Sequence, residues 1–129
     1  MGCFNMEKKL CYLASPYNSP ESKVKEYRYQ MAVQVAGILA NKGLHVFSPI
    51  AHSHPIMTNH ANLQGGWEYW QVLDLAILDI CKALYVLTIE GWRQSVGVTA
   101  EIARAKELGI PIMYIDAQGD EIRESWLSY

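Results

Sequence analysis

The sequence predicts an α/β protein whose parallel sheet is covered by helices on both faces. Short, almost wholly apolar segments alternate along the 129-residue chain with longer segments of helical periodicity. The apolar segments lack a polar face, which is typical of strands buried on both sides. Half of the residues are apolar, enough for one core. We therefore expect one domain over residues 1–129, with its core in residues 9–115.

The expected strands are the apolar segments, each bounded by a turn signal or a polar residue. They lie at Lys9–Ser15, Leu44–Pro49, Ala83–Thr88 and Ile110–Ile115. Between the second and third strands, Ile50–Gly66 is polar and irregular, with three histidines and paired glycines, and is expected to be a long loop.

The expected helices connect these strands. The first begins at Ser19-Pro20-Glu21, with a serine cap and proline in the first position, and ends at Gly43. Its apolar stripe is expected to be Val24, Tyr27, Met31, Val35 and Ile38. The others are Trp67–Cys81, Val98–Leu108 and a short terminal helix at Asp120–Leu127. This order predicts a Rossmann-like or flavodoxin-like three-layer fold with a four- or five-stranded parallel sheet.

The charge pattern argues against polymer and membrane partners. The net charge is −2 and both signs are mixed along the chain, so no basic surface for nucleic acid is expected. The apolar stretches are too short to span a membrane, and no signal peptide is recognisable. Three widely separated cysteines indicate neither a disulfide framework nor a zinc site, so a cytoplasmic protein is expected.

Cofactor signals are equally weak. The sequence has neither a phosphate-binding G-x-x-x-x-G-K-[ST] loop nor a G-x-G-x-x-G segment after a strand. His52, His54 and His60 share one segment, but no acid or cysteine accompanies them at ligand spacing. We therefore expect no metal and no cofactor, and keep His54 as a candidate substrate contact because it follows the second strand.

Glu101 is the most informative residue. On a helical wheel of residues 98–108 it lies on the apolar side with Ala105 and Leu108, so its carboxylate is expected to face the sheet. In the expected first turn, backbone N–H groups would keep it ionised although partly buried. This combination suits a carboxylate nucleophile, although a structural acid at a helix terminus is an equally open interpretation.

A second acid repeats the pattern. Asp74 shares one helix face with Trp70, Ile77 and Cys81. Asp79 is given a structural role instead, because Lys82 lies three residues further on. Parallel sheets collect ligands at the carboxyl ends of their strands, which places Tyr12–Asn18, Pro49–His54 and Ile89–Gly97 around one crevice.

Two short motifs and Asp74 together suggest a family. With Tyr12-Leu13-Ala14-Ser15-Pro16-Tyr17 after the first strand and Ser95-Val96-Gly97-Val98-Thr99-Ala100-Glu101 at the last helix, the sequence resembles the nucleoside 2-deoxyribosyltransferases. It is most similar to the branch that includes the 2'-deoxynucleoside 5'-phosphate N-hydrolases and their uncharacterised bacterial and phage relatives. The resemblance spans Lys9 to Ile115.

The resemblance implies roles for these residues. Glu101 would attack the anomeric carbon of a nucleoside or nucleotide, Asp74 would bind the sugar or assist the leaving base, and Tyr12 would position the nucleophile. Ser15, Tyr17, His54, Ser95 and Gly97 would contact the substrate, the last two near a 5'-phosphate. Ser15-Pro16 and Asn18 replace a Gly-Ser pair and an arginine of that branch, so we expect Arg93 to supply the cation.

The favoured function is therefore cleavage or transfer at an N-glycosidic bond, with a small-molecule nucleoside or nucleotide as partner. A non-catalytic nucleotide or nucleotide-sugar sensing module and a structural oligomer subunit stay open as alternatives. A homo-oligomer is also expected, because the segment Trp67–Cys81 is apolar on nearly all sides.

Overall fold

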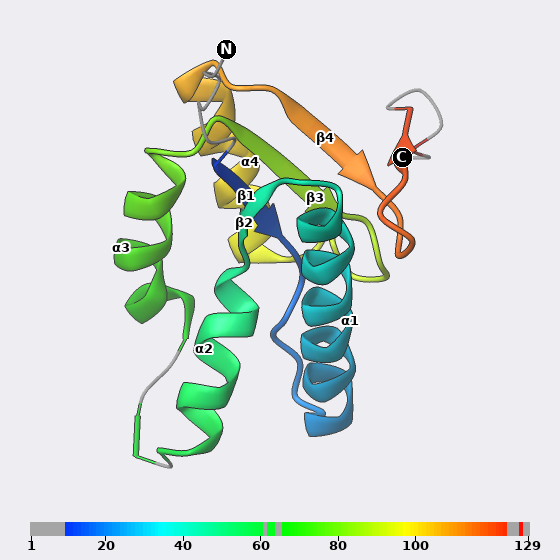
Figure 1. Ribbon diagram of the computed structural model, residues 1–129. Helices are drawn as coiled ribbons and strands as arrows, with labels where there is room; N and C mark the ends of the chain where they lie inside the picture. Colours follow the sequence, from blue (N-terminus) through cyan, green and yellow to red (C-terminus); the bar gives the residue numbers. More distant parts are fainter. Residues whose placement is uncertain (1–9, 61, 64–65, 124–126, 128–129) are drawn as a thin grey trace.

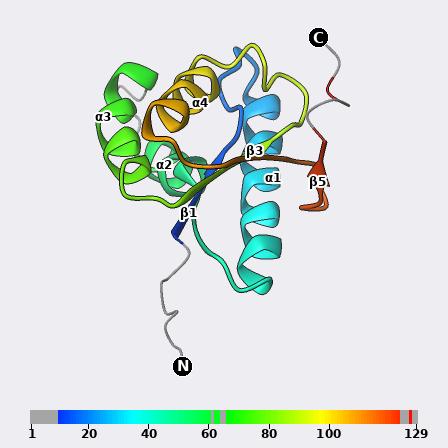
Figure 2. The ribbon, with the colours of Figure 1, turned by 90° about the horizontal axis from the view of Figure 1, so that it is seen from above.

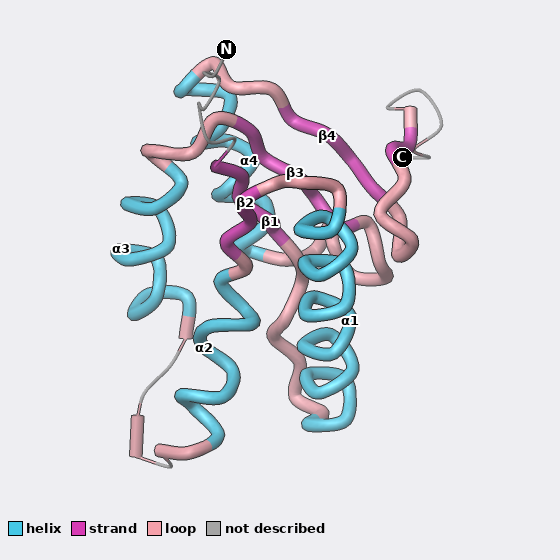
Figure 3. The backbone as a smooth tube through the Cα atoms, in the orientation of Figure 1, coloured by secondary structure: helices cyan, strands magenta, loops and turns pink. Residues whose placement is uncertain are grey.

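The computed structural model describes residues 10–60, 62–63, 66–123 and 127, and Figure 1 shows the course of the chain. Its strands are β1 Leu10–Ala14, β2 His45–Phe47, β3 Ala83–Leu87, β4 Ile112–Ile115 and β5 Glu121–Ile122. Its helices are α1 Ser22–Asn41, α2 Pro49–Thr58, α3 Trp67–Leu78 and α4 Val96–Leu108. Figure 3 shows how the helices alternate with the strands.

The strands form one sheet in the order β2-β1-β3-β4-β5. The first four are parallel, and β5 pairs antiparallel with β4. This is the flavodoxin-like order of doubly wound α/β folds, in which the order of the strands, and not the direction of the chain, reverses between β1 and β3. The predicted fold class is confirmed. Ligands of such folds bind at this reversal point, outside the carboxyl ends of the strands.

Successive residues of the central strands face opposite layers of the protein. Tyr12 and Val86 belong to a core cluster between the sheet and helices α3 and α4. Leu13 and Leu87 belong to a second cluster with Val35 of α1 on the other face. Figure 2 shows these helices on the two sides of the sheet. Burial on both faces explains why the strands lack a polar side in the sequence.

Helix α2 corrects the prediction of a long loop at Ile50–Gly66. Ser48 caps the helix, because its Oγ accepts a hydrogen bond of 3.1 Å from the backbone N–H of Ala51. Pro49 occupies the first helical position, where its missing N–H costs nothing. Pro55 lies inside the helix without ending it. The polar composition concealed a helix whose start signal was present in the sequence.

Two other element predictions were wrong. Helix α1 begins at Ser22 with Glu21 as its N-cap, so Ser19 and Pro20 precede it. Part of the expected terminal helix at Asp120–Leu127 is strand β5 instead, and residues 124–126 lie outside the described part. The backbone of Asp116 exchanges hydrogen bonds with Gly119 and Asp120, which reverses the chain into β5.

An exposed ion pair joins α3 and α4. Arg104 donates two hydrogen bonds, of 2.7 and 2.9 Å, to the carboxylate of Asp79. The structural role predicted for Asp79 therefore has Arg104 as its partner, and not the expected Lys82. No helix of the described residues is long and apolar enough to cross a membrane.

The burial pattern predicts different outcomes for two valine-to-alanine changes. Val86 of β3 is fully buried, whereas Val33 of α1 is 41% exposed. Val86→Ala is expected to lower the free energy of unfolding by roughly 2 kcal/mol or more, through lost burial and a cavity. Val33→Ala should change it little, because alanine is the better helix former. Urea denaturation measures both, and equal losses would contradict the layer assignment.

Candidate active site

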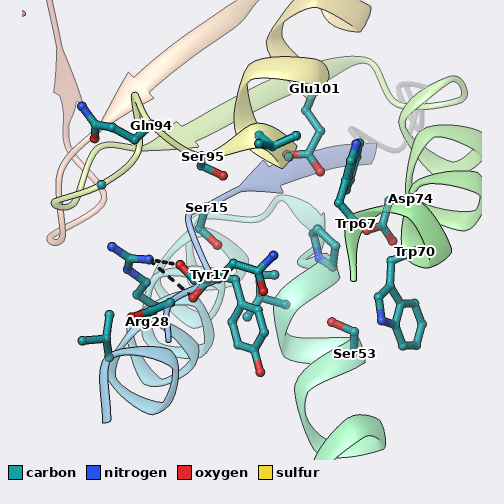
Figure 4. A pocket seen from close by; sticks show the side chains of 18 of the residues that line it. Ser15, Tyr17, Arg28, Ser53, Trp67, Trp70, Asp74, Gln94, Ser95 and Glu101 are labelled. Atoms are coloured by element: carbon teal, nitrogen blue, oxygen red, sulfur yellow. Dashed lines mark hydrogen bonds between the residues drawn. The ribbon is translucent and has the colours of Figure 1, made fainter. Parts of the chain in front are cut away.

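A cavity of about 550 Å³ opens at the carboxyl ends of β1 and β3. Its walls come from the segment after β1, from α1, α2 and α3, and from the loop and first turns of α4 (Figure 4). Because the strand order reverses at β1 and β3, the chains leaving these strands diverge and open this crevice.

The acidic end of the cavity is formed by Glu101 and Asp74. Glu101, from α4, is 4% exposed and accepts a hydrogen bond of 2.5 Å from the Tyr12 hydroxyl of β1. Asp74, from α3, is 5% exposed, and its Oδ1 has no hydrogen-bond partner within the described part of the chain. A buried carboxylate oxygen without a partner is costly to desolvate, so this oxygen is suited to a ligand group.

Burial shifts the protonation of this end. Desolvation raises the pKa of Glu101 to about 8; the Tyr12 hydrogen bond opposes this rise, and the nearby Asp74 charge adds to it. Desolvation also raises the pKa of Asp74 to about 6. The pKa of Tyr12 is raised by burial and then by the Glu101 charge, so Tyr12 remains a hydrogen-bond donor.

The position of Glu101 corrects one element of the sequence-based argument. Helix α4 begins at Val96 instead of Val98, so Glu101 lies in the second turn, beyond the free N–H groups of the helix start. The expected stabilisation of its charge by the first turn is therefore absent. Tyr12 is the group that favours the charged form, and the net effect of the surroundings favours the protonated one.

The start of α4 forms another part of the wall. Ser95 is the N-cap, and its Oγ accepts a hydrogen bond of 3.1 Å from the N–H of Val98. Gly97 lies against Trp67: a Cβ atom at this position would be 3.4 Å from the indole ring. Both predicted contacts, Ser95 and Gly97, therefore line the cavity beside an aromatic side chain.

The segment after β1 supplies Ser15 and Tyr17, which also line the cavity. Ser15 is 6% exposed, and its Oγ is a second buried polar atom with no hydrogen-bond partner in the described residues. Figure 4 shows the Ser15 hydroxyl between Glu101 and the Arg28 side of the cavity. Its position suits a ligand that extends between these two ends.

His54 and Arg93 do not line the cavity. His54 is buried in α2 behind Tyr17. The guanidinium of Arg93 lies 4.9 Å from the ring centre of its neighbour Trp92. The structure therefore brings together Glu101, Asp74, Tyr12 and four of the six expected contacts, Ser15, Tyr17, Ser95 and Gly97.

Arg28 is the cation among the described residues that line the cavity, and the sequence-based prediction missed it. Its guanidinium donates hydrogen bonds to the carbonyl oxygens of Tyr17, Asn18 and Glu90, at 3.4, 2.8 and 3.3 Å. It packs against Gly91, whose φ of 96° and missing side chain allow this approach. The sequence signal that could have found Arg28 was its helical spacing from Val24 and Ala32, which places it on the same face of α1.

Arg28 interrupts the true apolar stripe of α1, which is formed by Val24, Ala32, Val35 and Leu39. The last three are buried, whereas Tyr27 of the stripe expected from the sequence is 56% exposed. Within the described residues, no group of three histidine, cysteine or acidic side chains is arranged to hold a metal ion.

Comparisons with known proteins identify a family and a solved structure with a similar fold. The model of the family described as Domain of unknown function (DUF1937) matches residues 9–117. A solved structure of a 2-deoxyribosyltransferase from the psychrotolerant bacterium Bacillus psychrosaccharolyticus superimposes with a TM-score of 0.57. The two chains are 20% identical, over 88% of this chain and 77% of that one, so the likeness concerns the fold. No curated protein matches the sequence.

The raised pKa of Glu101 leads to a stability prediction. Between its ordinary value of 4.5 and about 8, the folded protein retains a proton that the unfolded chain has released, so stability falls as pH rises through this window. Glu101→Gln removes this penalty and should raise the free energy of unfolding at about pH 8, by an amount on the order of a few kcal/mol. The gain should disappear near pH 4.

Urea denaturation of the parent and the variant at both pH values measures this difference. A variant that differs from the parent equally at about pH 4 and pH 8 would contradict the prediction, because it would mean that Glu101 is ionised in the folded protein.

Proposed function

The chain belongs to the DUF1937 family, and we propose that its cavity cleaves or transfers the N-glycosidic bond of a nucleoside or nucleoside 5'-monophosphate. One observation carries this proposal. Glu101 is a buried carboxyl group held by a tyrosine hydroxyl, and it borders the same cavity as Asp74, a second buried carboxyl group with an unpartnered oxygen. Most enzymes that cleave glycosidic bonds use a pair of carboxyl groups in one active site.

In the proposed reaction, a carboxylate oxygen of Glu101 bonds to the anomeric carbon as the carbon–nitrogen bond breaks. The electron pair of that bond goes to the base nitrogen, and Asp74 supplies the proton that neutralises the leaving base. Water or a second base then attacks the same carbon, frees Glu101 and returns a proton to Asp74. Tyr12 holds the nucleophilic carboxylate in place throughout.

The proposed roles require the proton on Asp74, whereas the pKa values of the two acids favour it on Glu101. Between about pH 6 and 8 the pair holds one proton in the order of their pKa values, on Glu101 with the charge on Asp74. The reactive form has the same net charge but carries the proton on Asp74. Positive charge that develops on the sugar in the transition state favours an ionised Glu101, so binding and reaction draw the pair towards this form.

The walls suit the other parts of a nucleotide. Trp67 and Trp70 from α3 offer aromatic surface beside Asp74, where a base can stack (Figure 4). The start of α4, with Ser95 and Gly97, forms an anion-binding helix terminus between Trp67 and the Arg28 side of the cavity. On that side, the three hydrogen bonds of Arg28 to carbonyls use only part of its five donors. Arg28 therefore replaces Arg93 as the proposed phosphate cation.

A homo-oligomer is part of the proposal. The α3 side of the molecule exposes Tyr69, Val72 and Ile80, each more than half exposed, and Leu73 beside them. Grouped apolar side chains of this kind favour an interface between copies of the chain. Such an interface would cover the helix that carries Asp74.

Glu101→Gln tests the nucleophile. The parent is incubated with a panel of nucleosides and 5'-monophosphates, and free base is measured. On a substrate found in this way, Glu101→Gln should lose base release by several orders of magnitude, because an amide does not trap the sugar carbon, while ligand binding is retained. Asp74→Asn should be less severe.

Glu107→Gln is the matched control, an exposed glutamate on the same helix that should retain the parent rate. Turnover of Glu101→Gln near the parent rate would overturn the mechanism. Binding without turnover by the parent would instead favour a sensing module.

Arg28→Ala tests the phosphate end. Hydrogen bonds to charged groups contribute roughly 1.5–3 kcal/mol each, so this change should lower kcat/KM for a 5'-monophosphate by about tenfold or more. The matched nucleoside should be affected much less. Arg93→Ala serves as control and should leave both values unchanged. An equal loss for nucleoside and monophosphate would mean that Arg28 supports the loop and does not contact phosphate.

A further inference from the structure

A chain of three hydrogen-bonded side chains runs from the cavity wall to the surface. The hydroxyl of Tyr17 lies 2.7 Å from Nδ1 of His54, and Nε2 of His54 lies 3.0 Å from Oε1 of Glu26. Tyr17 lines the cavity, His54 is 7% exposed, and Glu26 is an exposed residue of α1. The chain thereby joins the segment after β1 to α2 and α1.

The chemistry of the three groups fixes the direction of both hydrogen bonds. Gln30 donates a hydrogen bond to the carboxylate of Glu26, and this contact, together with His54, keeps the pKa of Glu26 below its ordinary value. An ionised carboxylate only accepts, so the neutral imidazole carries its proton on Nε2. Nδ1 is then an acceptor, and the Tyr17 hydroxyl donates to it.

Packing fixes the imidazole as well. The ring of Tyr29 stacks on His54, with centres 4.1 Å apart and planes 23° from parallel. The ring of Tyr17 meets the same imidazole edge-on. His54 therefore has one orientation in which it accepts from Tyr17 and donates to Glu26.

These contacts determine the orientation of the Tyr17 ring. Figure 4 shows its hydroxyl turned away from Glu101, so the ring itself, and not the hydroxyl, forms the wall on this side. Trp67 and Trp70 belong to α3, on a different side of the same cavity. A ring that is already held in place loses little freedom when a ligand packs against it, and this favours binding.

We propose that His54 and Glu26 are positioning residues that hold Tyr17 as a fixed wall for the substrate, and so contribute to substrate affinity and not to bond cleavage. The proposal rests on the proposed function of the cavity. It assigns His54 a role behind the wall, in place of the direct substrate contact expected from the sequence.

The first test measures the imidazole directly and needs no substrate. In ¹⁵N-labelled protein, at a pH where the imidazole is neutral, long-range proton–nitrogen correlation of His54 should place its proton on Nε2. Glu26→Ala should move part of the population to the Nδ1–H form. Glu21→Ala, which removes an exposed carboxylate at the start of the same helix, should leave the ring unchanged. A proton on Nδ1 in the parent would overturn the proposal.

The second test is kinetic. Tyr17→Phe and Glu26→Ala should each raise KM by about three- to tenfold, the effect of one lost hydrogen bond, with kcat within about twofold of the parent. Glu21→Ala should change neither value. His54→Asn, which keeps an acceptor for Tyr17, should have a smaller effect than His54→Leu. Unchanged KM in Tyr17→Phe and Glu26→Ala, or a loss confined to kcat, would overturn the positioning role.

The two failures are distinguishable. If no nucleoside or 5'-monophosphate releases base, the proposed function fails, and the imidazole measurement still decides whether the hydrogen-bond chain exists. If base is released and KM is unchanged in both variants, the positioning role fails while the proposed function stands.

Discussion

The hydrogen bond between Tyr12 and Glu101 is the constraint on which the cavity depends. It joins the central strand β1 to helix α4 inside the protein, where an unpartnered carboxyl group would be strongly destabilising. Because Tyr12 is fixed by the sheet, the bond sets where the first turns of α4 lie above the carboxyl ends of β1 and β3. Ser95 and Gly97 thereby reach the same cavity.

Charges on buried helix faces are what the sequence predicts best. Glu101 and Asp74 interrupt apolar stripes, and both line the cavity. A charged side chain on a buried helix face needs a polar partner or a ligand, so such residues are good candidates for a site. Arg28 follows the same pattern on α1. It was overlooked because the stripe was drawn one residue away, through Tyr27. By contrast, Asp79 at the exposed end of α3 forms a surface ion pair with Arg104.

Strands and layers were also predictable, because strands that are buried on both faces consist almost entirely of apolar residues. Helix α2 was not. A serine followed by a proline occurs near the start of both α1 and α2. Helix α2 begins directly after Ser48, whereas α1 begins only after Glu21. The local signal is the same, and the surrounding packing decides. The surroundings of His54 were unpredictable for a related reason, because its partners Tyr17 and Glu26 lie far away in the sequence.

The two ends of the cavity carry opposite electrostatic problems. At one end, burial disfavours charge on Glu101 and Asp74; at the other, Arg28 is held by backbone carbonyls and forms no ion pair with a carboxylate of the described residues. A ligand with an anionic group at one end and a carbon that becomes positive at the other relieves both problems together. A neutral nucleoside relieves only the first, as its sugar carbon becomes positive. Under the proposed function, this arrangement stabilises a nucleotide most in the transition state, which is the requirement for catalysis and not merely for binding.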